Sequence, residues 1–145
     1  MSERGSFDFV EGATADLSLV ARGPSAAAVF HAAAEALATV TVEHIDAVEP
    51  RVSHELEMRD TELDLLLLRF LNELIYLRDA DGLVLRPRNV RVKVDGGPAL
   101  SAELAGETLD AERHGLGLEV KAATVYGLRI QPTDEGWEAS VTLDV

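Results

Sequence analysis

The sequence predicts an α+β fold: a single compact domain, residues 1–145, with a mixed or antiparallel sheet packed around two main helices. Two segments, at about residues 25–40 and 61–79, place apolar residues at helical spacing. Most of the remaining chain consists of short stretches in which apolar and polar residues alternate, as in strands with one buried face. A length of 145 residues suits one domain, and no repeat or linker divides the chain.

The second predicted helix is expected to be the central element of the core. Apolar residues occupy most of its circumference, and only Glu62, Arg69 and Glu73 form a clear polar strip. A helix with so little polar surface is covered on more than one side. The first helix begins at Gly23-Pro24-Ser25 and is rich in alanine, whose small side chain permits close packing against a neighbour.

Seven segments are predicted as strands or bent strands. Pro87 indicates a sheet edge or a bulge in the fourth of them. Residues 134–136 predict the turn of a hairpin that joins the last two, and residues 106–117 are expected to be irregular. The seven segments are residues 7–10, 16–21, 51–58, 83–94, 99–105, 120–132 and 137–145.

The composition excludes several classes of protein. Nucleic-acid affinity rests largely on lysine and arginine, and a chain with a net charge of −13 and two lysines is not expected to bind RNA or DNA autonomously. A small basic patch stays compatible with this composition. The absence of cysteine rules out disulfides and thiolate metal sites. No apolar run is long enough for a membrane span, and the N-terminus resembles no signal peptide, so we expect a cytoplasmic protein.

Nucleotide-binding and hydrolase motifs are absent from the sequence, which contains no Walker loop, GxSxG, GxGxxG or HExxH pattern. The histidines occur without metal-ligand spacing, so each is interpreted as a surface or half-buried residue with an ordinary partner. These residues are His31, His44, His54 and His114.

One pair of acids is a candidate for metal binding. Asp16 and Asp144 each lie at the end of a predicted strand, on the face opposite the apolar residues. If the two strand ends are adjacent, their carboxylates and the terminal carboxylate of Val145 form an all-oxygen site for a hard cation. The alternative is that both are solvated acids, which are common in an acidic chain.

Four blocks of sequence, in order and spanning nearly the whole chain, resemble the archease family. They are FDFVEGATADLSL, LLLRFLNELIYLRDADGLV, ERHGLGLEVKAATVYGL and GWEASVTLDV. Archeases are small acidic proteins that assist the RtcB-type, GTP-dependent RNA ligase of tRNA splicing. The resemblance implies a cofactor or chaperone, not an enzyme, that stimulates guanylylation and multiple turnover of that ligase without sequence-specific binding to nucleic acid.

The resemblance also implies a set of site residues. Family members bind a divalent cation, seen as calcium, through positions that match Asp16, Asp144 and Val145; magnesium or manganese also suits oxygen ligands. Lys121 and the pair Arg113-His114 match positions thought to support function. We expect Thr124 to place a hydroxyl on the same surface.

The chain departs from the family at one position. The family usually has histidine before its Thr-Ala-Asp motif, where this chain has Ala13, so a role that required that imidazole is in doubt.

Two other functions stay open at the level of sequence. One alternative is an independent metal-dependent hydrolase that uses Asp16 and Asp144, although no general base is evident. The other is a structural binding domain whose acids only keep it soluble. The stretch from Arg113 to Tyr126 is interpreted as a turn and a strand that place Lys121 beside the acidic site.

Overall fold

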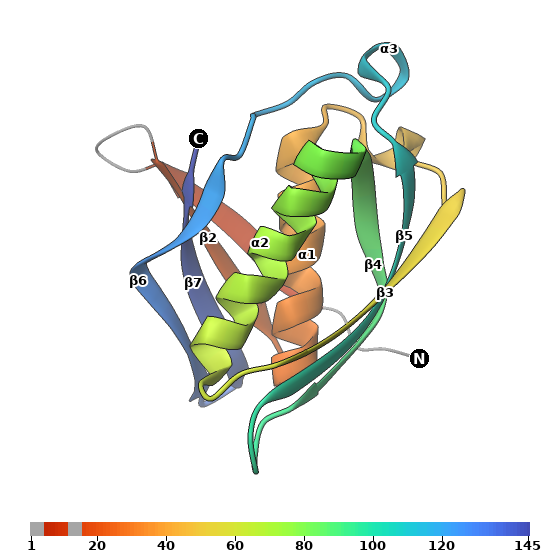
Figure 1. Ribbon diagram of the computed structural model, residues 1–145. Coiled ribbons are helices and arrows are strands. Elements are labelled where there is room, and N and C mark those ends of the chain that lie inside the picture. Colours follow the sequence, from red (N-terminus) through yellow and green to blue (C-terminus); the bar gives the residue numbers. More distant parts are fainter. Residues whose placement is uncertain (1–4, 12–15) are drawn as a thin grey trace.

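Two antiparallel sheets enclose a pair of helices in the computed structural model, which describes residues 5–11 and 16–145. Figure 1 shows α1 and α2 side by side between the sheets, with the small helix α3 at one end. The predicted α+β class and the two main helices are confirmed. The sheet is antiparallel throughout and is divided into two, whereas the sequence predicted one.

The helices begin and end close to the predicted bounds. Helix α1 spans Ala26–Thr41, and the Ser25 hydroxyl accepts a hydrogen bond from the backbone N–H of Ala28 at 3.1 Å, which caps its first turn. Helix α2 spans Leu63–Asp81 and ends at Gly82, whose φ of 68° is a left-handed conformation that favours glycine. The short helices are η1, Ile45–Ala47, and α3, Ala111–His114.

The four-stranded sheet has the order β1-β2-β7-β6, and the three-stranded sheet has the order β3-β5-β4. The hairpin of β6 and β7 and the irregularity at Pro87 are both confirmed. Residues 106–108 belong to β5, so the predicted irregular segment begins later than expected. The strands are β1 Ser6–Glu11, β2 Asp16–Gly23, β3 Val52–Arg59, β4 Leu83–Lys93, β5 Ala99–Thr108, β6 Ala122–Thr133 and β7 Gly136–Asp144.

The core lies between the sheets and around the two helices. Phe30 of α1 and Phe70 of α2 are fully buried and stack with their ring centroids 6.1 Å apart. Most of α1 is buried, because its alanines allow β2 and β4 to approach it closely. Helix α2 contacts both sheets, which confirms that it is covered on more than one side.

No helix in the described part of the chain has both the length and the hydropathy needed to cross a membrane.

Candidate metal and partner site

Asp16 and Asp144 lie directly opposite one another at the end of the four-stranded sheet. Antiparallel pairing of β2 with β7 places Asp16 against Asp144 and Leu17 against Leu143. Leu17 and Leu143 are buried, so the acids occupy the outer face of the sheet. Side chains of directly opposed residues have Cβ atoms about 4.5–5.5 Å apart, which brings the two carboxylates within reach of one cation.

The environment of these acids leaves part of their charge uncompensated. The Oδ1 atom of Asp16 is buried and accepts no hydrogen bond from any residue within the described ranges, and Asp144 is exposed. A buried oxygen without a partner costs about 1–3 kcal/mol, and more when it is charged. Like charges directly opposite on a sheet also repel one another. A cation bound between the two carboxylates would remove both costs, so the pair fits a hard divalent ion.

Val145 is the third residue of the predicted metal site. Val145 follows Asp144, and its side chain is half-buried against the core. Among the residues that the structure describes, no three His, Cys, Asp or Glu side chains cluster in a way that holds a metal. The structure therefore brings the two side-chain carboxylates together, and Val145 follows them directly in the chain. Ala13 lies outside the described residues.

Lys121 is joined to this site through its backbone. Its N–H donates to the carbonyl oxygen of Asp144 at 2.7 Å, and the next residue, Ala122, pairs with Asp144 in the sheet. The Lys121 side chain is exposed and makes no ion pair with a described residue. The structure thus brings a free ammonium-bearing residue into the same end of the sheet as the two acids.

Thr124 lies in the next row of the sheet, opposite Thr142. Its hydroxyl donates to the carbonyl oxygen of Thr142 at 3.1 Å, so that proton is already used within the sheet. The register of β6 against β7 then shifts, and residues 125–128 form a bulge in the strand. Val125 and Tyr126 are 67% and 77% exposed on this bulge. Both side chains are apolar or aromatic and lie on the strand in which Ala122 pairs with Asp144.

Arg113 and His114 have a structural role that the sequence did not predict. The His114 side chain is fully buried, so it is not part of a surface, which corrects its interpretation as a surface or half-buried residue. Its Nδ1 accepts from the N–H of Asp110 at 2.9 Å, and its Nε2 lies 3.1 Å from Oε2 of Glu107. Since Nδ1 is an acceptor, Nε2 carries the proton and donates to Glu107.

Glu107 is the centre of this buried network. The Arg113 guanidinium binds both of its carboxylate oxygens, and the backbone N–H of Glu49 donates to it at 2.6 Å. The Arg113 hydrogen bonds, followed by that from Glu49, hold the pKa of Glu107 far below its ordinary range. Arg113 also donates to the carbonyl oxygen of Ala47 at 2.8 Å. The network joins α3 and β5 to the loop after α1.

The glycines of this stretch permit close contact with the end of α1. The N–H of Gly117 donates to the carbonyl of Thr41 at 2.9 Å, and Leu118 bonds Val40 in the same way. A Cβ atom on Gly117 would lie 2.3 Å from the carbonyl oxygen of Val40. Gly115 has a φ of 71°. The glycines therefore serve backbone packing here and form no ligand loop.

Two residues of α2 that were not predicted as functional hold the strand that carries Lys121. The Asn72 side chain donates to the carbonyl of Ala123 at 3.0 Å and accepts from its N–H at 2.9 Å. The Arg78 guanidinium donates to the carbonyl of Val120 at 2.6 Å. The only local signal for these contacts is that each is a polar residue in a helix that is apolar over most of its circumference.

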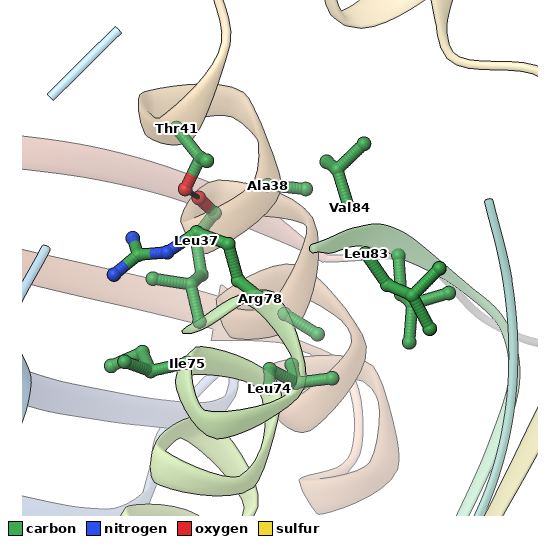
Figure 2. Close-up of a pocket in the computed structure, with 10 residues that line it drawn as sticks. Leu37, Ala38, Thr41, Leu74, Ile75, Arg78, Leu83 and Val84 are labelled. Carbon is green, nitrogen blue, oxygen red and sulfur yellow. Dashed lines mark hydrogen bonds between the residues drawn. The ribbon is translucent and has the colours of Figure 1, made fainter. Parts of the chain in front are cut away.

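A small apolar cavity between α1, α2 and β4 does not add a ligand site. Figure 2 shows it surrounded mainly by aliphatic side chains, including Leu37, Leu74 and Leu83. Its volume of about 20 Å³ is close to that of a single water molecule. Its two polar side chains are already bonded, Arg78 to Val120 and Thr41 to the carbonyl of Leu37.

Comparison with known proteins identifies the family. The model of the Archease protein family matches residues 7–145. "Protein archease" of Thermococcus gammatolerans is 38% identical over 134 residues, which cover 91% of this chain and 94% of that protein. "Protein archease" of Methanosarcina acetivorans is 30% identical over 147 residues, covering 99% of both chains.

Solved structures agree with this assignment. The solution structure of protein 1598 of Methanobacterium thermoautotrophicum superimposes with a TM-score of 0.82 at 29% identity and covers 96% of this chain and 98% of that one. The crystal structure of a Thermotoga maritima archease, described as a possible chaperone, has a TM-score of 0.58 at 17% identity and covers 93% of each chain. That second likeness shows the fold alone. The chain belongs to the archease family.

Proposed function

We propose that this protein is a metal-dependent protein cofactor, or chaperone, of an RtcB-type RNA ligase, and that it stimulates guanylylation and repeated turnover of that ligase. One observation carries the proposal: Asp16 lies directly opposite Asp144, and the buried Oδ1 of Asp16 has no partner among the described residues. Such a pair gains more from a bound calcium ion than from solvent. Membership of the archease family supports the choice of partner.

The neighbouring residues suit a protein-docking surface. The exposed Lys121, Val125 and Tyr126 supply a cation and an apolar anchor beside the acids. Aromatic and cationic side chains carry much of the binding energy in protein interfaces. A bound cation holds the two carboxylates in one arrangement, and the surrounding side chains contact the ligase.

The proposed mechanism is a shift of the conformational equilibrium of the ligase. A partner moves such an equilibrium only by binding one state more tightly than the other. This protein would bind the nucleotide-loaded conformation of the ligase preferentially and supply no catalytic group.

The test is transfer of GMP from radiolabelled GTP to the purified ligase, with and without this protein, in calcium and in EDTA. Faster guanylylation only in the presence of both protein and calcium supports the proposal. Stimulation that persists in EDTA and in an Asp16→Asn variant would remove the metal from the mechanism. Phosphodiesterase activity of the protein alone would favour the hydrolase alternative.

A further inference from the structure

A group of unpaired cations distinguishes the three-stranded sheet. The acids of the chain outnumber Lys and Arg by two to one, 26 against 13, so an unpaired cation is unexpected. Within residues 5–11 and 16–145, the side chains of Arg59, Arg91, Lys93 and Lys121 make no ion pair, whereas Arg88 does have a partner. The paired ones are Arg22, Arg51, Arg69, Arg78, Arg86, Arg113 and Arg129.

Three of the four unpaired cations are neighbours on one face. In the sheet order β3-β5-β4, Arg59 and Lys93 flank Ala99 from either side, and Arg91 lies opposite Ser101 in the adjacent row. All three cationic residues are exposed. Strand spacing places Arg59 and Lys93 about 10 Å apart, and Arg91 and Lys93 about 7 Å apart. The side chains therefore surround one region of the outer face.

Short side chains on the central strand leave a hollow between these cations. Ala99 and Ser101 form its floor, and the long cationic side chains rise on both flanks. The hollow has a volume of about 490 Å³ and lies next to the β4–β5 turn, which extends beyond the helices in Figure 1. We call it the β5 trough. Its lining is Glu57, Met58, Arg59, Arg91, Val92, Lys93, Ala99, Leu100 and Ser101.

We propose that the β5 trough binds the backbone phosphates of single-stranded RNA, without reading the bases. Arginine pairs with phosphate through two parallel hydrogen bonds, and lysine binds it as a point charge. The trough contains no aromatic side chain on which a base can stack, so the contact is independent of sequence. The contact is confined to the end of the sheet next to the β4–β5 turn, because Glu55 and Glu103 occupy the next row of the same face.

The same face is poorly suited to a protein partner. None of the exposed large hydrophobic side chains of the described chain lines the trough; they lie elsewhere, as Tyr76, Leu116 and Tyr126 illustrate. Protein interfaces rely on a buried apolar or aromatic anchor at their centre. The trough also faces away from Asp16 and Asp144, because the helices separate the two sheets. RNA binding there does not depend on the proposed function of the metal face.

The net charge of −13 limits this contact to a weak one without preventing it. Charges farther away than the Debye length, about 8 Å at physiological salt, are largely screened. Glu55 and Glu103 lie in the next row of the same face, and Glu57 lines the trough itself, where it flanks Ser101 from the side opposite Arg91. Glu57 is the acid nearest to the bound phosphates. Its charge opposes that of the phosphates. Removal of this charge is expected to strengthen the binding of RNA.

The two lysines of the chain provide a matched test. Fluorescence anisotropy of a short labelled oligouridylate would be measured with the full-length protein over a range of salt concentrations. With three phosphate contacts, the logarithm of the association constant should fall with the logarithm of the salt concentration with a slope of about −2. Lys93→Gln is expected to weaken binding and reduce the slope by about 0.7, whereas Lys121→Gln, the same change on the other sheet, leaves both unchanged. Equal losses from both variants would overturn the proposal.

A gain-of-binding variant and a competitor complete the design. Glu57→Gln is expected to raise the affinity for the oligouridylate, and the triple variant Arg59→Gln, Arg91→Gln, Lys93→Gln to abolish binding, with unchanged thermal melting in both. An oligoglutamate peptide with the same charge as the RNA should compete poorly for the site.

Competition by that peptide equal to that by unlabelled RNA would refute an RNA site. The absence of measurable RNA binding at low salt would also refute it. Neither result bears on stimulation of the ligase, which is measured in the guanylylation assay.

Discussion

The side-chain amide of Asn72 forms two hydrogen bonds with the backbone of a single residue, Ala123. It donates to the carbonyl oxygen at 3.0 Å and accepts from the N–H at 2.9 Å. Strand β6 is an edge strand of its sheet, and this amide takes the place of a neighbouring strand at that point. The contact fixes the segment whose N–H, at Lys121, bonds Asp144.

Replacement of Asn72 by alanine is expected to destabilise the fold. Ala123 is buried, so its N–H and carbonyl groups would lose their partners without gaining water, at a cost of about 1–3 kcal/mol in the free energy of unfolding. Urea denaturation measures this loss, and amide hydrogen exchange at Ala123 and Lys121 should accelerate. Asn89→Ala is the matched control, because the Asn89 side chain makes no hydrogen bond within the described chain; its effect should stay within about 0.5 kcal/mol. Equal effects of the two variants would show that the amide contact is not stabilising.

Calcium is expected to reverse the order of stability between the wild-type protein and Asp144→Asn. In EDTA the variant relieves repulsion between opposed acids and should be as stable as the wild type, or more stable by up to about 1 kcal/mol. At a calcium concentration one hundred times the dissociation constant, the free energy of unfolding of the wild type should rise by about 2.7 kcal/mol, and that of the variant by much less. Thermal melting with calcium and with EDTA measures both effects.

The control for this experiment is Asp134→Asn, in the exposed turn between β6 and β7. It removes the same charge from the other end of the strand pair, so it should not alter the response to calcium. If calcium stabilises all three proteins equally, the ion binds elsewhere or acts only by screening charge.

Local pattern predicted much of the fold and one half of the candidate site. Alternation along β2 and β7 placed Asp16 and Asp144 on the face opposite the core, and the structure agrees. Their direct opposition depends on the register between strands more than 120 residues apart, which no local pattern specifies. The burial of α2 was also predictable, because the helical spacing of its apolar residues is a local pattern.

Contacts between distant polar residues were not predictable in this way. Asn72 and Ala123 are 51 residues apart, and the amide contact leaves no trace in the periodicity of either segment. His114 was expected to be exposed, or half-buried with an ordinary partner, because histidine is often only partly buried. It is buried because Glu107 of β5 and the N–H of Asp110 satisfy both ring nitrogens. Hydrogen-bond partners of this kind are identified only from the folded structure.

Stability is expected to fall in acid in a way that depends on Glu107. Its pKa in the folded protein lies below the ordinary value of 4.5, so ionised Glu107 stabilises the fold fully above that pH. The contribution is lost as the pH falls from about 4.5 toward the lowered pKa. In Glu107→Gln the deficit relative to wild type should therefore be largest above pH 4.5 and should shrink in acid, as urea denaturation over a pH series would show.

Glu103→Gln serves as the control for that series. Glu103 lies on the same strand, β5, but is exposed and makes no ion pair with a described residue. Its replacement should alter stability little at any of these pH values. A deficit of Glu107→Gln that does not change with pH would contradict the lowered pKa.

Charge reversal at Lys121 is expected to weaken stimulation of the ligase while preserving the fold. The contact of Lys121 with Asp144 uses the backbone N–H, which any side chain at this position retains. The side chain is exposed and unpaired within the described chain, so Lys121→Glu should change the free energy of unfolding by about 0.5 kcal/mol or less. If this ammonium faces the ligase, a carboxylate in its place should lower the apparent affinity for the ligase about tenfold or more. Lys121→Arg keeps the charge and should retain most of the stimulation, as measured by guanylylation over a titration of each variant. Full stimulation by Lys121→Glu would show that Lys121 has only a structural role, through its backbone contact with Asp144.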